Sequence, residues 1–253
     1  MSGRLRIIGL GPGPASWLTP EAGEALAEAS DILGYAPYVA RHKASSHQRL
    51  HPSDNRVEAE RAAHALQLAA SGHDVALVSG GDPGVFAMAA ALVEALEALP
   101  LEARDIDISI LPGVTAVLAA AARLGAPLGG DFCVMSLSDN LKPWKVIKNR
   151  LDAANAGDFV LALYNPASKA RPRQIFEAFD ILRAGRAPAT PVAFARAIGR
   201  DDERILRCSL ADADPAEADM STLVLIGASH SRWVARPHGE PFLLTPRAVQ
   251  VRP

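Results

Sequence analysis

Short apolar runs alternate with longer amphipathic segments along the first half of the chain. The apolar runs end in turns rich in Gly, Pro and Asn, and the amphipathic segments have the spacing of helices. The pattern predicts strands near 4–10, 31–34, 74–79 and 105–111, and helices near 20–30, 57–71, 85–99 and 114–124. Alternation of this kind is typical of a parallel sheet covered by helices.

The pattern changes around the segment 125–130, where we place a domain boundary that gives domains 1–127 and 128–253. Beyond it, strands are predicted near 132–137, 158–164, 190–197, 203–209 and 221–227, and helices near 143–156 and 171–184. The last three strands follow one another with no long helix between them, which favours a mixed or antiparallel sheet. The tail from Ser231 onward is rich in proline, and we expect it to be irregular.

The segment 35–55 fits neither pattern, because it has no clear period and is rich in Arg, Lys and His. A connection of this length inside a compact domain is often a functional lid. A solvated surface excursion is the alternative, and the sequence leaves both open.

Four predicted strands end in loops that suit a small-molecule site. These loops contain Gly9 to Gly13, Gly80 to Gly84, Pro112 to Thr115 and Tyr164 to Ser168. Glycines let the backbone turn with positive φ and let a ligand approach closely. In open α/β sheets, ligands bind beyond the carboxyl ends of the strands. Several such loops beside one cleft would make a ligand site.

Two of these regions also carry predicted helix starts. Thr19 is a good N-cap with Pro20 as the first helical residue, and Asp82 with Pro83 repeats the arrangement before the next helix.

Composition narrows the class of protein. The chain has 253 residues, of which 49% are hydrophobic and 21% charged, with a net charge of −2. This balance is typical of a globular protein and argues against nucleic acid as a partner. No apolar run approaches the roughly 18 residues that suggest a membrane span. Two cysteines are too few for a disulfide framework, so we expect a cytoplasmic protein without a signal peptide.

Several common chemistries are excluded by missing patterns. The first glycine loop has Pro14 in place of the spacing that a dinucleotide fingerprint needs, and no phosphate-binding loop, metal-ligand cluster or nucleophile elbow is present. What remains is a ligand bound by backbone groups and small side chains, with no metal. This favours a group-transfer enzyme whose cosubstrate is already reactive, such as S-adenosylmethionine with its electrophilic sulfonium.

An ordered set of segments over about 5–230 resembles the tetrapyrrole (corrin/porphyrin) methyltransferases. The segments are GLGPGP with LTPEA, SGGDPGVFAMA, LPGVTAVLAAAARLGAPLG, LALYNPASKARP and STLVLIGASH. GYAPYV, DFCVMSLSDNLKPW and YNPASKARP are most similar to the branch that methylates carbon 17 of precorrin-3B in cobalamin biosynthesis. The resemblance implies methylation with contraction of the macrocycle, two α/β domains with S-adenosylmethionine in the cleft between them, and a homodimer.

The resemblance also implies site residues, position by position. The positions that match the cofactor cleft are Pro12, Gly81, Asp82, Val85, Phe86, Thr115, Ala116, Tyr164, Asn165, Ala195 and Thr222. A tetrapyrrole substrate carries many carboxylates, so cations near the cleft would bind it, and our candidates are Arg41, Lys43, Lys142, Lys169 and Arg171. We expect Arg171→Ala to weaken substrate binding more than methyl-donor binding. For proton transfer the candidates are Ser138 and Asp139.

One position departs from the branch. We expect His after Leu-Gly in the APLG-x-DF stretch, and this chain has Gly130. The hypothesis is that ring contraction is weakened at this position while methyl-donor binding survives. Three other functions stay open: a sister methyltransferase acting on another ring carbon or on a cobalt-containing intermediate, a non-catalytic tetrapyrrole-binding module, and a nicotinamide-dependent dehydrogenase. The broken glycine spacing disfavours the dehydrogenase.

Overall fold

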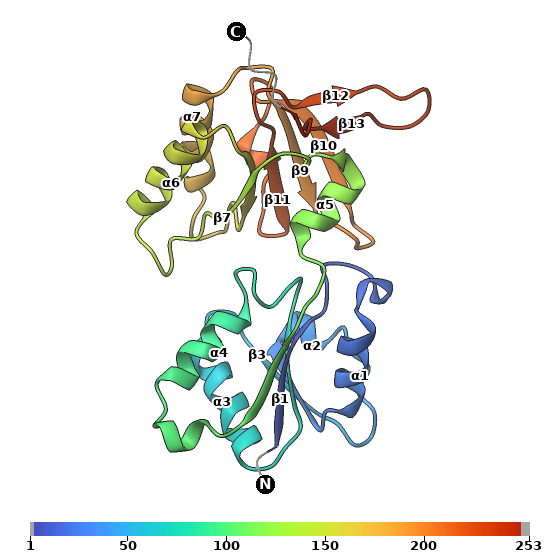
Figure 1. Cartoon of the computed structure of the whole chain (residues 1–253), viewed down its shortest axis with the longest axis vertical. Helices are drawn as coiled ribbons and strands as arrows, with labels where there is room; N and C mark the ends of the chain where they lie inside the picture. Colours follow the sequence, from blue (N-terminus) through green and yellow to red (C-terminus); the bar gives the residue numbers. More distant parts are fainter. Residues whose placement is uncertain (1–2, 249–253) are drawn as a thin grey trace. The chain divides into compact units, whose positions relative to one another are not determined.

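The chain folds into two compact units, one ending at Thr115 and one beginning at Ala116. The computed structural model describes residues 3–248 (Figure 1). Helix α5 (Ala116–Leu124) packs in the second unit, where Leu124 lies against Val160 and Leu225. The domain boundary predicted after residue 127 lies beyond this division by the length of α5 and a short turn. That domain boundary stays a prediction.

The first unit is built on a five-stranded parallel sheet with the order β3-β2-β4-β1-β5. Its strands are β1 (Arg4–Gly9), β2 (Asp31–Tyr35), β3 (Arg49–Ser53), β4 (Val75–Ser79) and β5 (Asp107–Leu111). Its helices are α1 (Pro20–Glu28), α2 (Ala36–Val39), α3 (Glu58–Ala70) and α4 (Met88–Glu97), with 3-10 turns at Ala15–Trp17 and Leu101–Arg104.

Alternate residues of the strands face opposite layers of helices. Ile7 and Leu77 pack against α3 and α4, whereas Ile8 and Val78 pack against α1 and α2. Figure 1 shows α3 and α4 on one side of β1 and α1 on the other. Burying one aliphatic side chain fully stabilises the fold by about 1.5–3 kcal/mol. Because both faces of the sheet are covered, the strands are apolar and alternate along the chain with the helices that cover them.

The segment 35–55, expected as a lid or a surface excursion, contains structure of its own. It forms α2 and the edge strand β3, which pairs with β2 from Asp31↔Arg49 to Tyr35↔Ser53. Pro52 is tolerated because an edge strand has one side without ladder bonds. Only the stretch between these two elements runs as a loop.

A buried carboxylate helps to hold this edge. Asp31 is 0% exposed, and its oxygens lie 2.8 Å from Arg49 Nη2, His51 Nε2 and His73 Nδ1. Burial by itself would raise the pKa of Asp31, but hydrogen bonds from Arg49, Ser30, His51 and His73 outweigh it and hold the pKa well below its usual range.

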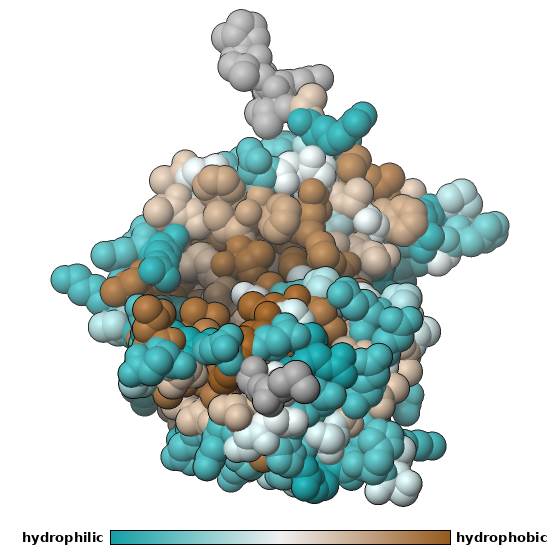
Figure 2. Space-filling view, turned by 60° about the horizontal axis from the view of Figure 1, so that its bottom comes forward, coloured by the Kyte–Doolittle hydropathy of each residue, from teal (hydrophilic) through white to brown (hydrophobic). Residues whose placement is uncertain are grey.

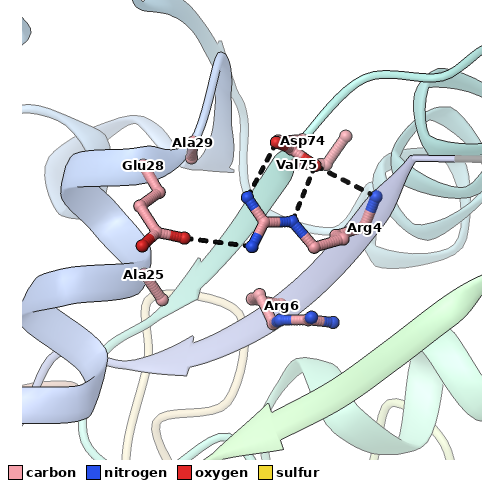
Figure 3. A pocket seen from close by; sticks show the side chains of 7 residues that line it. All are labelled: Arg4, Arg6, Ala25, Glu28, Ala29, Asp74 and Val75. Atoms are coloured by element: carbon pink, nitrogen blue, oxygen red, sulfur yellow. Dashed lines mark hydrogen bonds and ion pairs between the residues drawn. The ribbon is translucent and has the colours of Figure 1, made fainter.

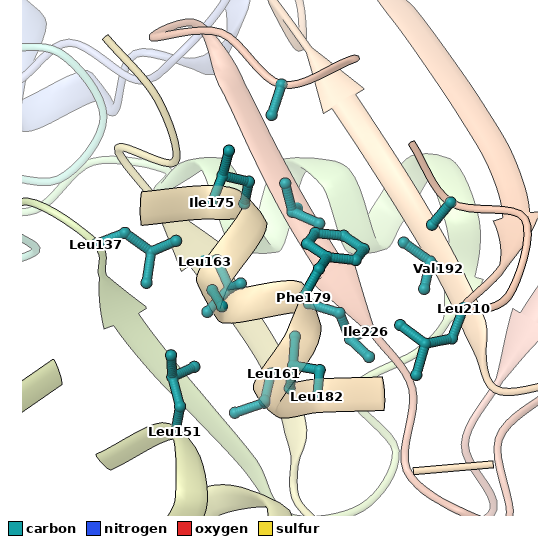
Figure 4. Packing of buried hydrophobic residues seen from close by; sticks show 14 of the residues in the cluster. Leu137, Leu151, Leu161, Leu163, Ile175, Phe179, Leu182, Val192, Leu210 and Ile226 are labelled. Atoms are coloured by element: carbon teal, nitrogen blue, oxygen red, sulfur yellow. The ribbon is translucent and has the colours of Figure 1, made fainter. Parts of the chain in front are cut away.

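The second unit carries a mixed five-stranded sheet with the order β10-β9-β11-β8-β7, in which only β7 and β8 are parallel. The strands are β7 (Phe132–Ser136), β8 (Val160–Tyr164), β9 (Pro191–Arg196), β10 (Arg204–Ser209) and β11 (Thr222–Ile226). Helices α6 (Trp144–Ala156) and α7 (Gln174–Gly185) cover one face, and a 3-10 turn spans Pro215–Glu217. Phe179 lies at the centre of that packing, stacked on Phe194 (Figure 4).

The tail predicted to be irregular forms two strands, so that prediction was wrong. Strands β12 (Arg232–Val234) and β13 (Phe242–Leu244) join β6 (Gly125–Ala126) in a three-stranded sheet with the order β12-β13-β6. Leu243 is fully buried against Val160 and Leu225, on the face opposite α6 and α7. The burial of this one leucine explains why a proline-rich segment is ordered. Both units are α/β, the first parallel and the second mixed, as predicted.

The face of the molecule in Figure 2 carries both hydrophilic and apolar side chains, and the apolar ones gather in patches. Large apolar side chains exposed beside strand ends include Phe86, at 50%, and Met220, at 48%. Among residues 3–248, no helix has the length and apolar character needed to cross a membrane.

Candidate functional site

Three loops of the first unit follow the carboxyl ends of neighbouring strands. They follow β4, β1 and β5, which are adjacent in the sheet. The chain leaves β1 toward α1 on one face and leaves β4 toward α4 on the other, so the pair β1–β4 is a topological switch point. Open α/β sheets bind ligands at such points.

Glycines let these loops pack backbone against backbone. Gly11 and Gly81 have φ of 66° and 74°, and the Gly11 amide donates to the Gly81 carbonyl at 3.1 Å. A Cβ on Gly113 would lie 2.4 Å from Gly81 O, and one on Gly9 would lie 2.6 Å from Gly113 N. Any side chain at Gly9 or Gly113 would therefore displace a strand end.

Asp82 fastens the β4 loop to the β5 loop. Its Oδ1 accepts from the amide of Gly84 at 2.8 Å, and its Oδ2 accepts from the amide of Gly113 at 3.0 Å. The predicted role of Asp82 as a helix N-cap was wrong, because α4 begins only at Met88. The left-handed conformation of Phe86, with φ of 52°, keeps the preceding residues out of the helix.

Arg41 braces the β1 loop. Its guanidinium donates to the carbonyls of Leu10 at 3.1 Å, Gly11 at 3.0 Å and Gly13 at 2.6 Å. We expected Arg41 to bind substrate carboxylates, but its donors point to this loop. Lys43 is exposed nearby in sequence. The remaining donor-site candidates of this unit lie in the same loops: Pro12 after β1, Val85 and Phe86 after β4, and Thr115 after β5.

In the second unit, the candidates from distant parts of the sequence meet at one end of the sheet. The ends of β7 and β8 pair as Ser136↔Tyr164, and the start of β11 pairs with the end of β9 as Thr222↔Arg196. The antiparallel pairing of β11 with β8 places that start at the same end. This pairing brings together the loop with Ser138 and Asp139, the turn at Asn165, Ala195 and Thr222. At the start of α5, the amide of Val117, beside Ala116, donates to Tyr164 Oη at 2.8 Å.

Hydrogen bonds define this end of the sheet. Asn165 has a φ of 50°, and its Nδ2 donates to Ser136 Oγ at 3.0 Å. The same Oγ accepts from the amide of Ser138 at 3.3 Å. Thr222 Oγ1 donates to Asp219 at 2.7 Å, and Ala195 is buried inside β9. The polar groups around Asn165 are therefore fixed by the protein itself.

The cationic candidates of this unit differ in environment. Burial lowers the pKa of Lys142, and the nearby charge of Arg150 lowers it further. Lys169 is exposed, whereas Arg171 is 6% exposed. Asp139 accepts from Gln174 Nε2 at 3.0 Å, and its other oxygen lies 3.7 Å from Arg171 Nε.

Gly130 lies away from this group of residues. It precedes β7, whereas Ser136 and Ser138 follow the other end of that strand. A Cβ on Gly130 would lie 3.3 Å from Thr245 Cγ2 and 3.8 Å from His230 Nε2. In the second unit, position 130 is thus at the opposite end of the sheet from the predicted proton-transfer residues.

A charged hollow in the first unit is not a ligand site (Figure 3). It lies at the amino ends of β1 and β4, and its charges neutralise one another. Arg4 pairs with Asp74 at 2.9 Å and with Glu28 at 3.0 Å, while Arg6 pairs with Asp107 at 2.7 Å. No group of His, Cys, Asp and Glu able to hold a metal ion occurs within the described part of the chain.

Sequence reasoning singled out Arg41 and Arg171 as substrate-binding candidates, but not the backbone carbonyls that they contact. Ser136, Gln174 and Asp219 were not singled out. Nothing in the sequence marks a side chain whose partners are backbone carbonyls far along the chain. Only the pairing of the strands brings these groups together.

Comparisons with known proteins identify the family and the fold. The family model described as Tetrapyrrole (Corrin/Porphyrin) Methylases matches residues 4–214. A precorrin-3B C(17)-methyltransferase of a Sinorhizobium species is 53% identical, covering 98% of this chain and 97% of that protein. A probable cobalt-factor III C(17)-methyltransferase of Salmonella typhimurium is 41% identical, covering 88% and 92%. The crystal structure of the methyltransferase CobJ matches with a TM-score of 0.93 and 52% identity, covering 97% of this chain and 100% of that one.

Proposed function

The chain belongs to the tetrapyrrole (corrin/porphyrin) methylases, and on that premise we propose that it methylates carbon 17 of precorrin-3B with S-adenosylmethionine. The same proposal includes contraction of the macrocycle to precorrin-4, in cobalamin biosynthesis. The observation that carries it is the 53% identity to a precorrin-3B C(17)-methyltransferase along nearly the whole of both chains.

The described residues fit a methyl donor bound largely by backbone groups. The packed glycines Gly11 and Gly81 leave no side chain at the switch point, so a ligand can approach the backbone closely. We propose that donor-binding residues of the first unit lie in the loops carrying Pro12, Asp82 and Thr115, and that those of the second unit lie in the Tyr164–Asn165 turn. When bound, the donor supplies an electrophilic methyl group on its sulfonium.

The protein's own contribution is then orientation. Asp82 and Arg41 fix the loops of the first unit, and Asn165 and Ser136 fix the turn of the second. Preorganisation of the site accounts for a large share of the rate enhancement when the cosubstrate is already reactive. The site needs no activated nucleophile of its own.

Cations supply the substrate side of the proposal. Lys142 is half-buried in the loop after β7, and Lys169 is exposed after β8. Burial disfavours the charged form of the Lys142 ammonium, and a bound carboxylate would offset that cost with its opposite charge, which favours binding of a polycarboxylate ring there. Ser138 and Asp139 in the same loop remain our candidates for proton transfer.

The test is anaerobic incubation of the purified protein with S-adenosylmethionine and either precorrin-3B or cobalt-factor III. We expect a gain of one methyl group and the absorbance of a ring-contracted product with precorrin-3B. Turnover of cobalt-factor III alone would move the function to the cobalt-containing series. Binding of S-adenosylhomocysteine with no methyl transfer to either substrate would favour a tetrapyrrole-binding role. Light scattering of the same sample tests the proposed homodimer.

A matched pair of variants links the activity to the site. Gly81→Val places a branched side chain at a φ of 74° in the β4 loop and is expected to abolish donor binding. Arg6→Ala removes an ion pair at the other end of β1 and is expected to keep both binding and turnover. Loss of donor binding in Arg6→Ala as well would mean that the assay reports folding, not the site.

A further inference from the structure

Arg171 is a buried cation whose guanidinium contacts backbone carbonyls of two different loops. We propose that it is a positioning residue, which fixes the methyl-donor turn of the second unit, and that it does not bind substrate. The proposal rests on the proposed function, because it assigns Arg171 a task in that same site. It replaces our sequence-based expectation for this residue.

The guanidinium connects three segments that the sheet brings to one end. Arg171 Nη1 donates to the carbonyls of Leu137 at 3.1 Å and of Asn165 at 3.2 Å, which follow β7 and β8. Its Nη2 lies 3.8 Å from Met220 Sδ, just before β11, and its Nε lies 3.7 Å from Asp139. The side chain is 6% exposed. Its donors are therefore directed at protein acceptors and not at solvent.

The local backbone sets this direction. The amide of Arg171 donates to the Ser168 carbonyl at 2.9 Å, and the amide of Ser168 donates back at 3.4 Å. This tight turn brings Arg171 back beneath the turn at Asn165 that begins the same loop. A planar guanidinium has several donors in a fixed fork, so one side chain can reach two carbonyls, whereas a lysine ammonium is a single point.

Asn165 is the residue through which Arg171 acts. It adopts a left-handed conformation with a φ of 50°, which asparagine accepts more readily than other non-glycine residues. Its carbonyl accepts from Arg171, and its side chain donates to Ser136 Oγ. Without the guanidinium, the carbonyls of Leu137 and Asn165 lose a charged donor in a buried place, and the turn loses the contact that fixes it.

The proposal reverses the expected order of effects. A cation that bound substrate would, when replaced, weaken substrate binding first. A cation that positions Asn165 would weaken donor binding first, because Asn165 belongs to the candidate donor site. The two roles are therefore separable by measuring both ligands on the same variants.

The experiment measures S-adenosylhomocysteine binding by calorimetry and the KM of each substrate in wild type, Arg171→Lys and Arg171→Gln. We expect S-adenosylhomocysteine to bind about tenfold more weakly to Arg171→Lys, the size of one lost hydrogen bond to a charged group. The KM for precorrin-3B should change less than the KM for S-adenosylmethionine. Arg173→Lys, an exposed change two residues away, is the control and should bind the ligand as wild type does.

A double-mutant cycle with Asn165→Ala, which keeps the carbonyl that accepts from Arg171, tests whether Arg171 acts on the donor through the Asn165 side chain. If Arg171 acts through Asn165, adding Arg171→Lys to Asn165→Ala should weaken binding by less than twofold further. Additive losses would overturn the proposal, as would a raised KM for precorrin-3B with unchanged S-adenosylhomocysteine binding. If Arg171→Lys fails to fold, Arg171→Gln replaces it, because its side chain keeps a neutral NH2 donor group. The same two results, additive losses or a raised KM with unchanged S-adenosylhomocysteine binding, would then overturn the proposal. Failure of the wild type to bind S-adenosylhomocysteine would refute the proposed function instead.

Discussion

Asp82 offers a direct test of how the loops of the first unit are held. Asp82→Asn keeps the size of the side chain and removes its charge. One amide oxygen can still accept from the amide of Gly84, but the NH2 group then faces the amide of Gly113, where a carboxylate oxygen now accepts at 3.0 Å. Two donors would oppose each other across the junction of the β4 and β5 loops.

The expected cost follows from the bonds that change. A hydrogen bond to a charged group contributes about 1.5–3 kcal/mol. Because Asp82 is only half-buried, we expect its loss to cost somewhat less, about 1–2 kcal/mol. If the loops must be joined to bind the methyl donor, the Kd of S-adenosylhomocysteine should rise by about tenfold, since 1.4 kcal/mol is one factor of ten. The amides of 113–115 should exchange hydrogen faster in the variant, because their anchor to the β4 loop is lost.

Calorimetry and hydrogen exchange measured by mass spectrometry provide the two readouts. Asp107→Asn is the control, since it removes a carboxylate that pairs with Arg6 at the other end of the sheet. We expect it to leave the Kd unchanged. Wild-type affinity in Asp82→Asn together with unchanged exchange at 113–115 would refute the reasoning, because the loops would then be joined without Asp82.

Three further predictions concern the rest of the fold. Because the pKa of Asp31 lies below the ordinary 3.8, the stability that this carboxylate contributes is present at neutral pH and is lost as the pH falls below that value. Hydrogen exchange in 31–35 should therefore rise on acidification in the wild type and rise less in Asp31→Asn. An equal rise in the two proteins would contradict this prediction. Thr19→Ala removes the cap of α1 and should cost about 1 kcal/mol in denaturant unfolding, whereas Thr19→Ser should cost little. Gly130→His should leave turnover unchanged because the position lies at the far end of β7, and a gain in turnover would instead support a missing histidine.

Elements that bury a continuous apolar face could be predicted from the sequence. The strands around Leu77 and Leu161 are almost entirely apolar, as expected for strands covered on both faces. The N-cap at Thr19 could also be predicted, because N-capping depends only on neighbouring residues. Its Oγ1 accepts from the amide of Ala22, as an N-cap side chain does. These features depend on residues close together in the chain.

Features that depend on distant partners could not be predicted. Strand β3 contains Pro52 and polar residues, and it is held in the sheet by pairing with β2 and by contacts with the distant residues Asp31 and Arg61. Strand β13 forms because Leu243 finds a buried place beside Val160. The loss of helix before Met88 likewise follows from tertiary contacts of the β4 loop. In the candidate site, small residues and turns were visible in the sequence, but the arginines that fix them were not.

The pairing of β13 with β6 has a consequence for synthesis on the ribosome. The residues of the first unit are continuous in the chain up to Thr115, so its sheet can close while later residues are still being added. The second unit cannot complete the layer around Leu124 until Leu243 has emerged from the exit tunnel. Until then the apolar face that Leu243 covers is open, and it is in this interval that a nascent chain would depend most on chaperones.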